Sequence, residues 1–236
     1  MRINKPISEI MIKFIGFSTI ALCFATTAVV GQSNDWVFEQ ANKLSPAVNS
    51  DAEDIMPVLT QDGNTMYFVR GLHEANTGGK DGGHDIWMSK KAADGSWSAS
   101  VNDLPNLNNE ENNAVIGINA SSNSLFLLNA YKKQDVGEDE RGISLAEDKS
   151  GSWGKPSFVK LPSFKTNTPE QGYYVSPEGD LIIMAVNSTN TLGGEDLYVS
   201  ELKDGNWSEP VHMGNVINSK GYEMSPFLSN DRKHLF

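Results

Sequence analysis

Cysteine is almost absent from this chain, and basic residues never gather. The single cysteine, Cys23, lies in an apolar run near the N-terminus, so the remainder has no thiol chemistry and must be stabilised by packing. The basic pairs Lys90-Lys91 and Lys132-Lys133 are isolated, whereas binding to a phosphate backbone requires clustered basic groups. We therefore expect no disulfides and no nucleic-acid partner.

Catalytic and metal-binding signatures are absent as well. The four histidines fall at unrelated positions, and no nucleophile motif such as GxSxG lies near them. Asp81, His84 and Asp85 cluster in NTGGKDGGHD, but a calcium loop needs several oxygen ligands at ordered spacing, and paired glycines supply no side-chain oxygen. The sequence predicts no enzyme activity, no metal and no cofactor.

Long apolar runs are confined to the N-terminus. Lys13 precedes FIGFSTIALCFATTAVV, which ends in small residues before Gly31, and this arrangement predicts a secretory signal peptide over residues 1–31. An uncleaved membrane anchor is the alternative, because the run is close to the roughly 20 residues that a spanning helix needs. Translation can begin at Met1 or at Met11, since MIK followed by the apolar run is an ordinary signal.

The expected mature chain is acidic. Removal of residues 1–31 leaves 16 basic and 29 acidic residues, so the net charge moves from −11 to −13. A charge of this size keeps a protein soluble, which is its simplest explanation.

A repeated block is the clearest positive signal. The stretch GGHDIWMSKKAADGSW, residues 82–97, returns as GGEDLYVSELKDGNW at residues 193–207. Tryptophans that precede similar segments recur at Trp36, Trp97, Trp153 and Trp207, at intervals of 61, 56 and 54 residues. A period of this length is typical of architectures built from repeated supersecondary units.

Each unit divides into four short strands. In the first unit these are IMPVLT, TMYFVR, DIWMSK and WSASVNDL, separated by turns such as Asp62-Gly63 and Asp94-Gly95. Four antiparallel strands per repeat predict an all-β fold of the β-propeller type. The expected blades cover residues 51–108, 109–166 and 167–218, and a fourth begins at residues 219–236.

The two ends of the chain indicate whether the repeated units can close into a propeller ring. The segment from Trp36 to Asn49 matches the fourth strand of a blade, so we expect it to complete the last blade, which also hides open edges. The chain stops at HLF, where the first unit reads MYF and continues. Three blades and one added strand cannot close a ring, so the sequence predicts an incomplete propeller, the N-terminal fragment of a larger domain.

The second unit departs from the pattern. It has DERGISLA where the others have GGxD, and its turn reads NASSNS without Asp-Gly. We expect less regular blade geometry there, or a separate task for its loop NAYKKQDVGEDERG.

Together these motifs resemble the TolB-type β-propeller family with WD40-like repeats, found in envelope proteins of Gram-negative bacteria. The resemblance covers residues 36–236. It rests on NSDAEDIMPVLTQDGNTMYF, on NSKGYEMSPFLS, and on the GGxD and DGxW blocks. The residues of these repeated blocks to which we assign a structural role are Gly82, Gly83, Asp85, Trp97, Trp153, Gly193, Gly194, Asp196 and Trp207.

The resemblance implies a location and a role. It implies export across the inner membrane to the periplasm or the outer membrane, and a non-catalytic scaffold that binds an envelope protein or glycan. Some relatives carry an OmpA-like domain, which implies peptidoglycan association through a segment beyond Phe236. The alternative is a propeller enzyme, or an enzyme-associated domain, acting on glycans or peptides, because fold alone does not decide function.

Two groups of repeat residues leave alternatives open. The tryptophans are expected to pack between blades, although aromatic rings that face a groove can stack on sugars. Asp54, Glu170 and Glu223 precede the strand nearest the ring axis, so they are candidates for carboxylates at one end of a central channel. Alternatively, each carboxylate caps its own turn.

Overall fold

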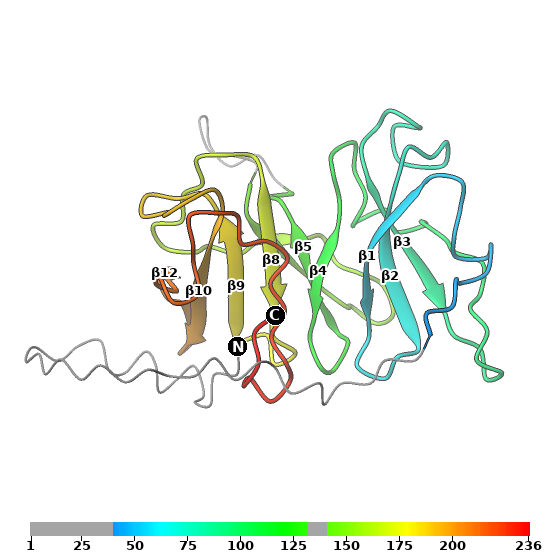
Figure 1. Cartoon of the computed structure of the whole chain (residues 1–236). Helices are drawn as coiled ribbons and strands as arrows, with labels where there is room; N and C mark the ends of the chain where they lie inside the picture. The colour runs from blue at the N-terminus through cyan, green and yellow to red at the C-terminus, as the bar shows by residue number, and fades with distance from the viewer. Residues whose placement is uncertain (1–39, 132–140) are drawn as a thin grey trace, which may run out of the picture. The chain divides into compact units, whose positions relative to one another are not determined.

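The computed structural model describes residues 40–131 and 141–236, and within them it is an all-β protein. In these two ranges, twelve strands form three antiparallel sheets, which follow one another in chain order (Figure 1). The prediction of an all-β fold is confirmed. No helix in the described part of the chain is long and apolar enough to cross a membrane.

The first sheet has three strands rather than the expected four. Strands β1 (Glu53–Leu59), β2 (Thr65–Gly71) and β3 (Asp85–Lys90) pair in that order. The segment from Trp97, predicted as a fourth strand, makes only two isolated bridges to the third-strand region. Ser98 explains this difference, because its hydroxyl accepts the Lys90 N–H and its carbonyl accepts the Ser89 hydroxyl. These side-chain bonds replace regular ladder bonds.

The second sheet is complete, although its sequence is the least regular. Strands β4 (Val115–Ile118), β5 (Ser124–Leu128), β6 (Ile143–Glu147) and β7 (Ser157–Phe158) pair in order. Ser122 adopts φ 56° in the β4–β5 turn, at the position that Gly63 holds in the first unit with φ 69°. The side-chain oxygen of Asn119 accepts N–H bonds from Asn123 and Ser124, which holds this turn closed. All four strands of this unit are therefore present, although the β4–β5 register shifts between Val115 and Gly117. Residues 132–140 of its loop lie outside the described residues.

The third sheet repeats the first with a split outer strand. Strands β8 (Gln171–Val175), β9 (Leu181–Val186) and β10 (Asp196–Lys203) pair in order, and β11 (Asn206–Trp207) and β12 (Val211–His212) both pair with β10. Ser208 separates these two pieces in the way that Ser98 does in the first sheet: its hydroxyl accepts the Glu201 N–H, and its carbonyl accepts the Ser200 hydroxyl.

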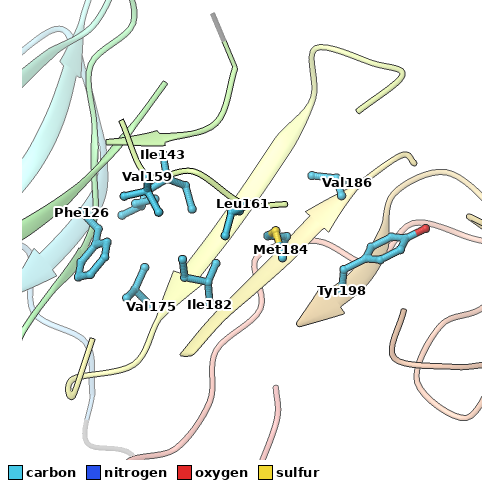
Figure 2. Packing of buried hydrophobic residues seen from close by; sticks show 10 residues of the cluster. Phe126, Ile143, Val159, Leu161, Val175, Ile182, Met184, Val186 and Tyr198 are labelled. Atoms are coloured by element: carbon cyan, nitrogen blue, oxygen red, sulfur yellow. The ribbon is translucent and has the colours of Figure 1, made fainter. Parts of the chain in front are cut away.

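Alternating side chains pack consecutive sheets face to face. Leu125 and Leu127 of β5 join Tyr67 and Ile86 of the first sheet in one cluster, whereas Phe126 between them points to the opposite face. Phe126 belongs to a second cluster that the second and third sheets share. Figure 2 shows this cluster, with members Phe126, Ile143, Val159, Leu161, Val175, Ile182, Met184, Val186 and Tyr198.

The first strands of the three sheets are neighbours. Within the unit Leu44–Pro226, β4 contacts β1 on one side and β8 on the other. Successive meander sheets that meet through their first strands are the arrangement expected of propeller blades.

The two ends of the described chain, residues 40–49 and 227–236, contribute no strand to the three sheets. Residues 40–49 form no strand, and a turn in which Ser45 accepts the Val48 N–H occupies part of the predicted closing segment. Trp36 lies outside the described residues. Phe227–Phe236 belongs to a second unit, in which the backbones of Phe227 and Phe236 bond in both directions to make a short hairpin.

Candidate functional site

Asp85 fastens the long loop between β2 and β3. Its side chain is fully buried at the start of β3, and Oδ2 accepts hydrogen bonds from the Thr77 N–H at 2.8 Å and from Asn102 Nδ2 at 3.2 Å. Burial raises the pKa of Asp85 above its ordinary value, and these hydrogen bonds offset only part of the shift. The bonds come from within the loop and from the segment after β3, so one carboxylate connects both.

Asp196 does the same in the third sheet with a different partner. Its Oδ2 accepts the Leu192 N–H at 2.7 Å and His212 Nε2 at 2.7 Å. The Gly214 N–H donates to His212 Nδ1, so Nε2 carries the proton that bonds to Asp196. Asp85 and Asp196 each keep a second buried oxygen, Oδ1, without a hydrogen-bond partner among the described residues.

The paired glycines allow close backbone approaches. Gly83 has φ +84°, and a Cβ there would lie 2.7 Å from the Glu111 carbonyl oxygen. At Gly193 a Cβ would lie 2.4 Å from the Gly221 carbonyl oxygen. Gly82 and Gly194 lie in the same two loops. The GGxD blocks therefore fit each loop against the segment that leads to the next unit.

Two asparagines that sequence reasoning missed bind the same region. Asn108 accepts the Ile86 N–H at 2.8 Å and donates to the Ile86 carbonyl at 3.0 Å, and Asn218 does the same to Leu197 with the same distances. Ile86 and Leu197 each follow the buried aspartate. Their similar spacing in the two aligned units, 22 residues after Ile86 and 21 after Leu197, is the signal that could have identified them.

Two of the three carboxylates predicted at a channel end have hydrogen-bond partners within their own unit. Asp54 accepts the Ser50 N–H at 2.6 Å and pairs with Arg70 Nε at 2.6 Å, and Glu223 accepts the Ser219 N–H at 3.1 Å. Glu170 is exposed just before β8. In the described ranges, no group of three or more His, Cys, Asp or Glu side chains is placed to hold a metal ion.

Arg70 on β2 is the cross-strand partner of Asp54 on β1. It is 4% exposed, donates to the Val48 carbonyl, and stacks its guanidinium 4.1 Å from the centre of the Trp87 ring. Burial raises the pKa of Asp54, but the Ser50 and Arg70 hydrogen bonds and the Arg70 charge outweigh it, so the net pKa lies below the ordinary value.

Two of the three repeated tryptophans in the described residues pack between sheets. Trp153 lies against the cluster shared by the first two sheets, and Trp207 against the cluster shared by the second and third. Trp97 packs against Val48 and the outer face of the first sheet. Trp153 differs from the others because it also lines a groove of about 570 Å³ between the first two sheets.

Comparisons with known proteins give little beyond this geometry. No family model and no curated protein matches the chain. Among solved structures, one from a study of two prolyl endopeptidases has a TM-score of 0.37 and 12% identity over 67% of this chain. Prolyl oligopeptidase B from Galerina marginata has a TM-score of 0.36 and 15% identity over 78% of this chain. The matched regions are 22% and 26% of those chains, so this chain corresponds to about a quarter of their length.

Proposed function

We propose that the chain is a non-catalytic binding module of the β-propeller type, which holds an envelope partner on the loops that join second and third strands. The observation that carries this proposal is a repeated contact, here called the loop lock, in which a buried aspartate at the start of a third strand accepts a backbone N–H from the loop before it. Asp85 and Asp196 hold equivalent loops of two sheets from fully buried positions. A loop that is already ordered loses little conformational entropy on binding, so locked loops favour recognition.

Each locked loop also offers an apolar contact. Leu72 and Leu192 are 51% and 48% exposed in the β2–β3 and β9–β10 loops. Because antiparallel strands alternate in direction, these two loops leave their sheets at corresponding ends. Rigid scaffolds commonly bind their partners with loops placed in this way.

The finer parts of the proposal rest on the sequence motifs. They are the TolB-type family, export by residues 1–31, and residence in the periplasm or at the outer membrane. Exposed apolar side chains support further blades: Ile55 and Leu59 on β1 are 41% and 52% exposed, and Tyr222 and Met224 after the third sheet are 72% and 67% exposed.

Site-directed photocrosslinking in cells tests the proposal. We would place a photoreactive residue at position 72 or 192 of the full chain, with exposed Lys155 on the β6–β7 turn as the matched control. We expect one defined adduct from positions 72 and 192, none from 155, and an envelope location that is lost when residues 1–31 are removed. Equal labelling from position 155, retention in the cytosol, or hydrolysis of glycans or peptides by the purified chain would contradict it.

A further inference from the structure

The groove between the first and second sheets has the features of a small-ligand site. Its volume of about 570 Å³ lies within the range of roughly 300–1,000 Å³ that is usual for such sites. The β1–β2, β4–β5 and β6–β7 turns border it, at the end of the sheets opposite the locked loops. It therefore differs from the proposed partner-binding surface.

The floor of the groove is apolar and partly aromatic. Tyr67 and Trp153 lie edge to face, with ring centres 6.4 Å apart and planes at 71°, and Met88 lies beside them. Tyr67 is buried, and its burial raises the pKa of its hydroxyl. Trp153 is only half-buried, so part of its ring remains available to a ligand.

The rim of the groove is polar and carries both charge signs. Asp103 is exposed, and its carboxylate makes no hydrogen bond or ion pair with any residue that the structure describes. Asp148 uses Oδ1 to accept the Gly151 N–H at 2.7 Å. Lys90, a donor, lines the same groove as these acceptors. Its other polar lining residues include Asp62, Asn106, Ser122 and Ser152.

We propose that this groove binds a neutral saccharide. A sugar ring has an apolar C–H face that fits the Trp153 ring, and hydroxyls at its edge that need both donors and acceptors. Lys90 supplies donors, and Asp103 and Asp148 supply acceptors. Anionic ligands are disfavoured by the rim carboxylates and by the net charge of −11, whereas a cation would meet Lys90. The site goes beyond the proposed function and does not depend on an envelope partner.

Calorimetric titration of the purified full chain tests the saccharide site. The probes are hexasaccharides of α-1,4-linked glucose, β-1,4-linked glucose and β-1,4-linked N-acetylglucosamine, with trilysine as a cationic probe. We expect at least one hexasaccharide to bind, and Asp103→Ala and Trp153→Phe to weaken it about tenfold or more, which corresponds to about 1.4 kcal/mol. Glu209→Ala and Trp207→Phe are the matched controls, because neither residue lines the groove.

Three results would overturn this inference. They are no binding of any hexasaccharide, saccharide binding that the groove variants leave unchanged, and binding of trilysine alone, which would assign the groove to a cationic peptide. Asp103 is exposed and without a partner among the described residues, so its removal does not threaten folding, and circular dichroism verifies the tryptophan variants. Crosslinking at positions 72 and 192 is independent of these titrations, so either proposal can fail alone.

Discussion

His212 donates a hydrogen bond from Nε2 to the buried carboxylate of Asp196 over 2.7 Å, and Asn102 makes the corresponding contact to Asp85 over 3.2 Å. One repeat position therefore holds an imidazole in one sheet and an amide in another. Each of the two side chains presents an N–H to the same carboxylate oxygen, Oδ2, of its aspartate.

This equivalence predicts the outcome of two substitutions at one position. His212→Asn recreates the Asn102 contact and should lower the free energy of unfolding by less than about 1 kcal/mol, whereas His212→Ala removes a partner of a buried carboxylate and should cost about 1–3 kcal/mol. Urea denaturation of both variants measures the difference. Equal losses would show that packing of the ring, and not its hydrogen bond, matters.

The paired hydrogen bonds that Asn108 and Asn218 make to one backbone residue each predict that their removal changes dynamics locally. Asn108→Ala leaves both backbone groups of Ile86 without their side-chain partner and should lower the free energy of unfolding by about 2 kcal/mol. Hydrogen exchange should accelerate at the Ile86 amide and stay unchanged at Leu197, which Asn218 still holds. Asn218→Ala should give the reverse pattern, and uniform acceleration in either variant would argue against independent clamps.

The raised pKa of Asp85 predicts a specific pH dependence. Because the folded chain holds this proton to a higher pH than the unfolded chain, the stability that Asp85 contributes is present below about pH 4 and is lost as pH rises through the folded pKa. The stability of Asp85→Asn relative to the original chain should therefore increase as pH rises above about 4. Denaturation series between pH 3 and 8 test the sign.

Asp54 provides the opposite case within the same sheet. Its pKa is lowered, so its stabilisation is present above about pH 4 and is lost as pH falls through the folded pKa. Asp54→Asn leaves the buried Arg70 charge without its carboxylate and should cost about 3 kcal/mol at pH 7. That loss should shrink in acid, because both the Ser50 hydrogen bonds and the Arg70 pair favour the ionised carboxylate. A loss independent of pH would show that the ionised form of Asp54 does not stabilise the fold.

Two glycines with the same φ allow the cost of backbone strain to be measured apart from the cost of a steric clash. Gly83 and Gly95 both have φ +84°, but a Cβ at Gly83 meets the Glu111 carbonyl, whereas a Cβ at Gly95 meets nothing within 4 Å. Gly95→Ala should cost about 1–2 kcal/mol through the backbone conformation, and Gly83→Ala a further 1–3 kcal/mol or so through overpacking. Thermal unfolding of both variants compares them, and similar losses would mean that the loop yields at Glu111.

Strand positions were predictable wherever alternation and turn residues agreed. IMPVLT, TMYFVR and DIWMSK fall in β1, β2 and β3, because turn residues separate them and their apolar side chains alternate between the two faces of the sheet. The fourth strand was not predictable in the same way. The hydroxyls of Ser98 and Ser208 accept backbone N–H bonds that would otherwise belong to the strand ladder. Nothing in the sequence distinguishes such a serine from any other.

For the candidate carboxylates as well, the sequence predicted positions but not contacts. The repeat pattern predicted that Asp54, Glu170 and Glu223 precede the first strands of their units. It could not reveal that Arg70 forms an ion pair with Asp54, or that the Ser219 N–H donates to Glu223. These contacts depend on side-chain direction at strand ends.

The sequence alone determined the all-β class, the repeated unit, and the recurrence of Asp85 and Asp196 after paired glycines, because these depend on residues close together in the chain. Only the tertiary structure decided which side chains complete the locks, and that Tyr67 and Trp153 meet across two sheets above a common groove. The reason is that residues about ninety positions apart come together only when the faces of consecutive sheets pack, and that packing follows from the whole core and not from any single segment.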